Sequence, residues 1–168
     1  EHIVWTDEGF NNILNVCPEL KDRTLVMNGV SKAYSMTGWR IGYTGGPADI
    51  IKGMKKVQSQ STSNPCSIAQ AAAQEALNGD QSFLAEMCQV FRDRHDFVYK
   101  TLNNMDGVEC LPSDGTFYSF PSFRSVIERM DGIEDDVQLA QLLLEKAEVA
   151  LVPGSAFGLP GHIRLSFA

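Results

Sequence analysis

The stretch that decides the fold covers residues 28–43 and reads NGVSKAYSMTGWRIGY. A short apolar run, TLVM at residues 24–27, precedes it, and a second run, RIGYT at residues 40–44, overlaps its end. The first run closes with Asn-Gly and the second with Gly-Gly-Pro, which is typical of two short strands bounded by turns. We therefore expect Lys32 to lie just beyond the end of the first strand, in the connection to the second.

Lys32 and Arg40 are the candidate site residues of this connection. An amine that attacks a carbonyl has to be neutral, and a nearby positive charge disfavours its ammonium form. An arginine supplies that charge, and its planar fork can hold two phosphate oxygens at once. The pair therefore indicates a phosphorylated aldehyde as ligand. Taken singly, most lysines are solvated and most strand arginines make surface ion pairs, so this interpretation depends on the surrounding pattern.

The rest of the chain alternates helical and strand patterns. The hydrophobic periodicity and the turn residues predict helices at 47–57, 67–77, 80–105 and 135–147, and strands at 108–111, 116–120, 149–152 and 163–167. Residues 58–64 are polar and are expected to form a loop. His95 stands among charged residues, which favours a solvated helix face. This order is typical of the α/β class, with a boundary near residues 75–80.

Composition excludes several classes of function. A net charge of -7 and a pI near 4.9 argue against a nucleic-acid surface, which needs clustered Lys and Arg. No stretch approaches the roughly 20 apolar residues that span a bilayer. The four cysteines are widely spaced and have no histidine at metal-ligand spacing, which indicates reduced thiols, no metal site and a cytoplasmic protein. The chain opens without Met, so we expect a segment of a longer protein.

The run at residues 28–43 resembles the active-site lysine signature of class I, fold-type I aminotransferases, which depend on pyridoxal 5'-phosphate. The resemblance is strongest to the aspartate-aminotransferase-like bacterial branch. Further stretches follow in the family's order: SNP at 63–65, GTFY at 115–118, VPGSAFG at 152–158 and RLSFA at 164–168. The resemblance implies that residues 1–78 end the large cofactor-binding domain. Residues 79–168 would then be the small C-terminal α/β domain, truncated.

The same resemblance implies roles for three residues. Lys32 would form the Schiff base with the cofactor and move a proton, Arg40 would bind the phosphate, and Arg164 would clamp the substrate's α-carboxylate. Many relatives have a phosphate-binding serine three residues before the lysine, where this chain has Gly29. The implied reaction moves an amino group between an amino acid and a 2-oxo acid. Aspartate is the first choice of donor, and aromatic amino acids, prephenate and alanine remain open.

The resemblance also implies that parts of the active site lie outside this chain. They are an aspartate at the pyridine nitrogen, a tyrosine at the phenolic oxygen, and residues of the partner subunit of a homodimer, so the isolated segment is expected to be inactive. Two alternatives stay open. A carbon–sulfur lyase of the same fold would differ in its product, and an effector-binding domain of a transcriptional regulator would follow a helix-turn-helix.

Overall fold

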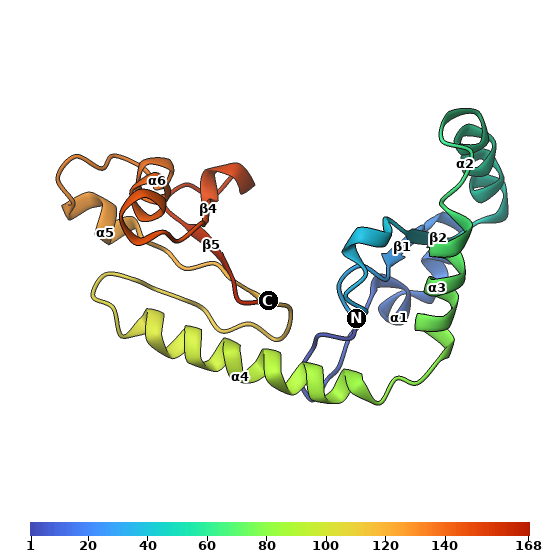
Figure 1. Ribbon diagram of the computed structural model, residues 1–168, viewed down its shortest axis with the longest axis horizontal. Coiled ribbons are helices and arrows are strands. Elements are labelled where there is room, and N and C mark those ends of the chain that lie inside the picture. The colour runs from blue at the N-terminus through green and yellow to red at the C-terminus, as the bar shows by residue number, and fades with distance from the viewer. The chain divides into compact units, whose positions relative to one another are not determined.

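The computed structural model describes all 168 residues, which form two compact units. The first unit consists of residues 1–2 and 9–84, and the second of residues 3–8 and 85–168 (Figure 1). The predicted boundary between residues 78 and 79 concerns the domains of a full-length enzyme and stays a prediction. No helix is both long and apolar enough to cross a lipid bilayer. All four cysteines are free.

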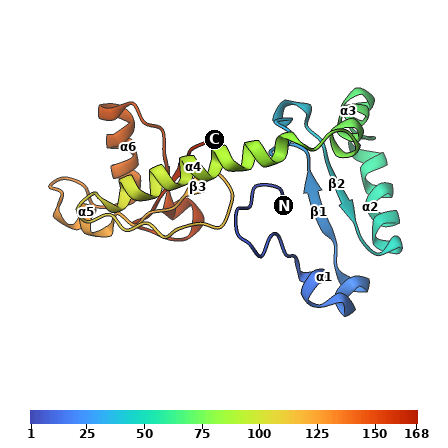
Figure 2. The same cartoon turned by 90° about the horizontal axis from the view of Figure 1, so that it is seen from below.

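The first unit is built around one antiparallel pair of strands, with Gly29 opposite Gly42 at the end of the pair. Figure 2 shows the two strands side by side, with two helices next to the second strand. In chain order the elements are α1 (Ile13–Val16), the 3-10 turn η1 (Pro18–Arg23), β1 (Val26–Gly29), the 3-10 turn η2 (Thr37–Trp39), β2 (Gly42–Gly45), α2 (Ala48–Ser61) and α3 (Ser67–Asn78).

The helices of this unit begin and end largely where the local sequence predicts. Helix α3 stops at Asn78, and Gly79 is its C-cap residue. Helix α2 is longer than predicted and continues through residues 58–61, which were expected to form a loop. The reason is that these polar residues contain no Gly or Pro, and an exposed helical turn needs no apolar residues. The next strong breaker in the sequence is Pro65.

The core of the first unit joins the inter-strand connection, residues 30–41, to helix α3. Val30 has no exposed surface, and Met36 and Ala73 are buried beside it. Tyr34 packs against this cluster and donates a hydrogen bond from its hydroxyl to Oε1 of Gln81, 2.8 Å away. Burial and the Glu1 carboxylate raise the pKa of Tyr34 above its ordinary value of 10.0, so this hydroxyl keeps its proton well above neutral pH. The connection is therefore packed against α3 through Val30 and Met36, and Tyr34 bonds to Gln81, three residues beyond that helix.

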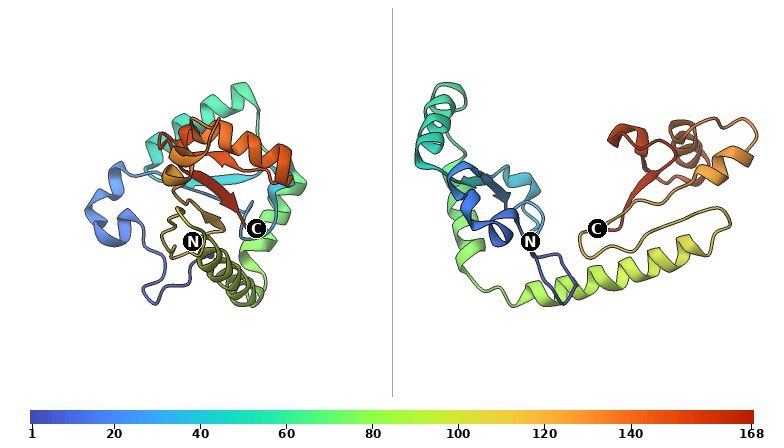
Figure 3. Two further views of the ribbon diagram at one scale, coloured as in Figure 1. Left: turned by 90° about the vertical axis from the view of Figure 1, so that its left-hand side faces the viewer. Right: turned by 180° about the vertical axis from the view of Figure 1, so that it is seen from behind.

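The second unit contains a small antiparallel sheet in the order β3-β5-β4. Figure 3 shows its helices beside these strands, and the long helix α4 with an extended segment returning along it. In chain order the elements are α4 (Phe83–Asn103), β3 (Tyr118–Ser119), α5 (Arg124–Arg129), α6 (Asp136–Ala147), β4 (Val152–Pro153), the 3-10 turn η3 (Gly154–Phe157) and β5 (Ile163–Ser166).

Several expectations for this unit need correction. The strand predicted at residues 108–111 is a single bridge between Glu109 and Ser122, and helix α5 was not predicted. Residues 3–8 belong to this unit, because Val4 pairs with Gly115 and the Trp5 indole donates to the Ser113 carbonyl. Such pairings join residues more than a hundred positions apart, so no local pattern announces them.

His95 is buried, with 4% of its surface exposed, and the expectation of a solvated helix face is wrong. Its Nε2 accepts a hydrogen bond from the Ser113 amide at 3.0 Å, and its Nδ1 lies 3.0 Å from the Asp96 carboxylate. The ring stacks on Tyr99 and lies 5.2 Å from the Trp5 ring, measured between centroids. His95 therefore joins α4 to the segment around Ser113 and to residues 3–8.

We expect His95→Ala to lower the free energy of unfolding by about 2–4 kcal/mol, because it opens a cavity and leaves the Ser113 amide without its acceptor. Urea unfolding followed by circular dichroism measures the change. Arg92→Ala, at an exposed position of the same helix, is the matched control and should change stability by no more than about 0.5 kcal/mol. Equal effects of the two substitutions would contradict this role of His95.

Candidate active site

The candidate lysine lies where the sequence predicts, three residues beyond the end of β1. Lys32 is exposed, although Val30, two residues earlier, is completely buried. Residues 31–35 form turns held by backbone hydrogen bonds, among them Ser35 to Lys32 and Met36 to Ser31. The turn therefore places Lys32 at the surface of the unit, while the buried Val30 and Met36 on either side anchor its backbone.

Gly29 lies opposite Gly42 at the end of the strand pair. A Cβ atom at this position would stand 3.3 Å from the Ile41 carbonyl oxygen and 3.5 Å from Cα of Gly42. A larger residue would therefore push the second strand away by a few tenths of an ångström. The glycine allows close pairing at the point where the lysine connection begins, and it offers no hydroxyl to a phosphate.

Arg40 lies at the other end of the connection, two residues before β2 begins. Its backbone is left-handed, with φ 53° and ψ 49°, which is uncommon for a residue other than glycine. The guanidinium is exposed and donates one hydrogen bond, from Nη1 to the Thr37 carbonyl at 2.9 Å. Because Gly29 and Gly42 are paired, Lys32 and Arg40 both lie at the same end of the strand pair.

An amine and a guanidinium at one end of a strand pair suit a phosphorylated aldehyde. The amine can bind the carbonyl carbon, and the guanidinium has five N–H donors, of which Thr37 takes one. Neither residue is used to fill the core. The chemistry of this donor set therefore fits pyridoxal phosphate.

Arg164 belongs to the second unit, where β5 carries it. Its Cζ atom lies 4.7 Å from the centroid of the Tyr118 ring and 4.8 Å from that of Phe157. A cation this close to an aromatic face is attracted by the ring's electrons. The side chain is half-buried, so it is partly shielded but can still contact a ligand.

Phe157 belongs to the η3 loop, residues 154–161, which is held by a buried carboxylate. Asp136, with no exposed surface, accepts hydrogen bonds from the Ser155 amide at 2.7 Å and from the Ser155 hydroxyl at 2.6 Å, and a weaker one from the Gly161 amide at 3.2 Å. Burial by itself would raise the pKa of Asp136, but these hydrogen bonds outweigh it and the pKa lies below its ordinary value of 3.8.

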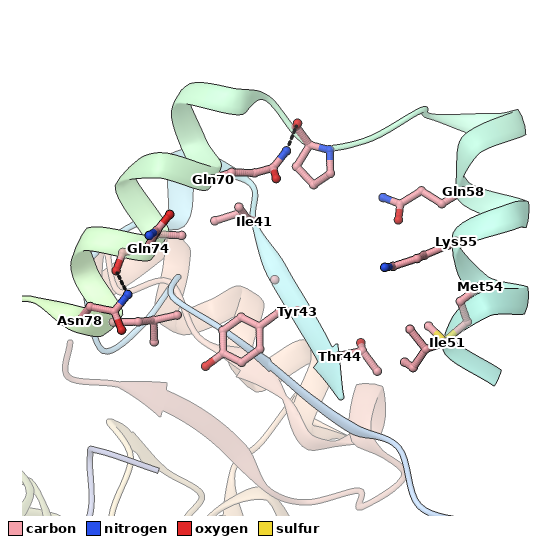
Figure 4. Close-up of a pocket in the computed structure, with 14 residues that line it drawn as sticks. Ile41, Tyr43, Thr44, Ile51, Met54, Lys55, Gln58, Gln70, Gln74 and Asn78 are labelled. Atoms are coloured by element: carbon pink, nitrogen blue, oxygen red, sulfur yellow. Dashed lines mark hydrogen bonds between the residues drawn. The ribbon is translucent and has the colours of Figure 1, made fainter. Parts of the chain in front are cut away.

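A separate pocket of about 690 Å³ lies in the first unit between β2, α2 and α3. Figure 4 shows Lys55 and Gln58 extending from α2 toward β2, and Gln70 and Asn78 hydrogen-bonded to carbonyls of their own segment. Its lining includes none of the three predicted site residues. We therefore place the candidate site at the lysine connection and not in this pocket.

The fold is that of part of a fold-type I aminotransferase. Residues 1–168, the whole chain, match the family model described as aminotransferase class I and II. The chain therefore belongs to this family, and the predicted fold class is confirmed.

Similar proteins include an aspartate/prephenate aminotransferase of Nitrosomonas europaea, which is 57% identical over 173 residues, covering 100% of this chain and 44% of the relative. An aspartate aminotransferase of Rhizobium meliloti is 49% identical over 172 residues, covering 100% of this chain and 42% of that protein. The chain thus spans less than half the length of these curated relatives.

Solved structures of aspartate aminotransferases have the same fold as this chain. The crystal structure of an aspartate aminotransferase from Rhizobium meliloti superimposes with a TM-score of 0.92 at 49% identity, over 99% of this chain and 42% of that one. The aspartate aminotransferase structure from Thermotoga maritima gives a TM-score of 0.84 at 42% identity, over 99% of this chain and 40% of that one.

The sequence did not predict the surroundings of Arg164. The adjacent Asp135 and Asp136 look equivalent in the sequence, yet the first caps helix α6 through the Gln138 amide and the second is buried under the η3 loop. The one local indication is that two acidic residues stand together at a helix start, where a single N-cap residue suffices. Nothing local links Asp136 to Ser155, or Phe157 to Arg164.

We expect the second unit to lose stability in acid through Asp136. A carboxyl group whose pKa is lowered by folding stabilises the native state above its unfolded pKa, and this contribution is lost as the pH falls through the folded pKa. The free energy of unfolding should therefore drop more steeply below about pH 4 in the wild type than in Asp136→Asn. Urea unfolding between pH 7 and pH 3 gives both curves.

At pH 7 we expect Asp136→Asn to cost about 1.5–3 kcal/mol, the range for hydrogen bonds to a charged group. Asp135→Asn removes the same charge from the neighbouring residue and keeps a good N-cap, so its curve should parallel that of the wild type. Parallel curves for Asp136→Asn and the wild type across this pH range would show that the carboxylate contributes nothing.

Proposed function

We propose that this chain is the C-terminal portion of a pyridoxal-phosphate-dependent aminotransferase. Residues 1–78 would end its large domain and residues 79–168 would form its small one. The observation that carries the proposal is the exposed lysine and arginine at one end of a strand pair, in a chain whose whole length matches the family. The reaction would move an amino group between an amino acid and a 2-oxo acid.

Pyridoxal phosphate, when bound, supplies an electron sink for the charge left at the substrate's α-carbon after proton removal. Lys32 would hold the aldehyde end of the cofactor through its amine, and would carry the proton that leaves the α-carbon once substrate has displaced it. Arg40 would hold the phosphate with the N–H groups of its guanidinium. Arg164 would bind the substrate's α-carboxylate in the same way and so orient the bond that breaks.

Aspartate is the first substrate to test. Two of the relatives described above are named an aspartate/prephenate aminotransferase and an aspartate aminotransferase, and both are similar to this chain over its whole length. We propose 2-oxoglutarate as the matching acceptor and prephenate as a second one. We further propose a cytoplasmic homodimer, in line with the free thiols and the family.

In the full-length protein, we expect Lys32→Ala to lower kcat for transamination of aspartate by at least about 10²-fold, because a positioned acid–base group contributes roughly 10²–10⁴-fold. A coupled assay of oxaloacetate formation measures it. Lys52→Ala, at an exposed position of α2, is the control and should retain full activity. Retained activity in Lys32→Ala would refute the proposed role. Pyruvate release from a cysteine-type substrate, with no amino transfer, would indicate the lyase.

The isolated chain should show negligible turnover, because the groups that the family uses at the pyridine ring lie outside it. Titration with pyridoxal phosphate, borohydride reduction and peptide mass mapping would show whether Lys32 still reacts. An adduct on Lys32 in preference to Lys52 would support the assignment. Turnover by the isolated chain comparable to that of the full-length protein would contradict the expectation.

A further inference from the structure

Arg164 packs against two aromatic rings from different elements. Tyr118 comes from β3, which pairs directly with β5, so the sheet sets the position of its backbone. Phe157 comes from η3, which is not a strand of that sheet. The two rings lie 4.7 and 4.8 Å from Cζ of Arg164. A long arginine side chain confined in this way has less freedom to lose when it binds a carboxylate.

The position of Phe157 is set by its loop more than by its own packing. The side chain is 50% exposed, and Phe120 contacts it edge to face, with 5.9 Å between centroids. The loop backbone is tightly folded: a Cβ atom at Gly154 would stand 2.3 Å from the Leu159 carbonyl oxygen. Hydrogen bonds to the buried Asp136 hold Ser155, two residues before Phe157.

We propose that Asp136 is a positioning residue for substrate binding. Through Ser155 it fixes the η3 loop, the loop fixes the Phe157 ring, and the ring keeps the Arg164 guanidinium in place for a substrate carboxylate. Asp136 itself does not touch the substrate. The inference rests on the proposed function, in which Arg164 binds the α-carboxylate, and it adds two residues, Asp136 and Phe157, to those that determine substrate affinity.

The test uses the full-length enzyme and four variants: Asp136→Asn, Phe157→Leu, Asp135→Asn and Arg164→Ala. We expect Asp136→Asn and Phe157→Leu to raise KM for aspartate about three- to tenfold while kcat changes less than about twofold. This is the size expected when one rotamer-rich side chain must be ordered on binding. The absorbance spectrum of the bound cofactor should not change. Asp135→Asn, which removes the same charge one residue away, should keep the wild-type KM.

A second readout does not depend on turnover. Succinate, an unreactive dicarboxylate, should bind less tightly to Asp136→Asn and Phe157→Leu by the same factor in calorimetry. Phe157→Leu changes a half-exposed residue and should fold normally. If Asp136→Asn does not fold, Ser155→Ala, which removes only the hydroxyl bond, replaces it, and Ser155→Thr should restore the wild-type affinity.

The two proposals fail in different ways. If the wild type transaminates, Arg164→Ala raises KM, and both Asp136→Asn and Phe157→Leu behave like Asp135→Asn, then the positioning role is overturned and the proposed function stands. If the wild type transaminates no amino acid, the proposed function fails. In that case a loss of succinate affinity in Asp136→Asn but not in Asp135→Asn would still support the positioning of Arg164.

Discussion

The pairing of Gly29 with Gly42 is the constraint on which the candidate cofactor site depends. It closes the connection of residues 30–41 at its base, so that the chain must turn back within a short distance. The left-handed backbone at Arg40 is one result of that turn. Because Val30 and Met36 are buried against α3, the connection cannot swing as a loop, and the two exposed basic residues keep a fixed backbone beneath them. Rigid support of this kind is what a site that must orient a small cofactor requires.

In the second unit, the long cationic side chain of Arg164 is held in place without an ion pair that would neutralise it. A carboxylate beside Arg164 would hold it firmly but would compete with an anionic substrate. Aromatic faces attract the guanidinium and leave its N–H groups for a ligand. The negative charge that stabilises this region is instead that of Asp136, which is buried and bonded to Ser155. The arrangement therefore separates the charge that stabilises the loop from the charge that would bind substrate.

How far the sequence predicts this structure depends on whether the signal is local. The strand pair, the placement of Lys32 after β1 and the extent of α3 follow from runs of a few residues, and all three were predicted. The burial of His95 was not predicted, because its four charged neighbours in the sequence are typical of a solvated helix face. Its actual surroundings include Trp5 and Ser113, which are distant in the sequence. The buried role of Asp136 was not predicted either, because the sequence places it only near the start of the helix expected at residues 135–147 and its partner Ser155 is distant in the sequence. The roles of Lys32, Arg40 and Arg164 rest on resemblance, since composition alone would leave each as an ordinary surface residue.

The two-stranded sheet of the first unit has a further consequence. Within residues 1–168, β1 and β2 each have one unpaired edge, and Met27 on β1 is 76% exposed. An open edge offers backbone N–H and C=O groups to whichever extended segment reaches it first, and a sheet of only two strands gains stability from any such addition. The same edges can pair with another part of one chain or with a second chain. Intramolecular capture of these edges is independent of concentration, whereas capture by a second chain accelerates as chains accumulate.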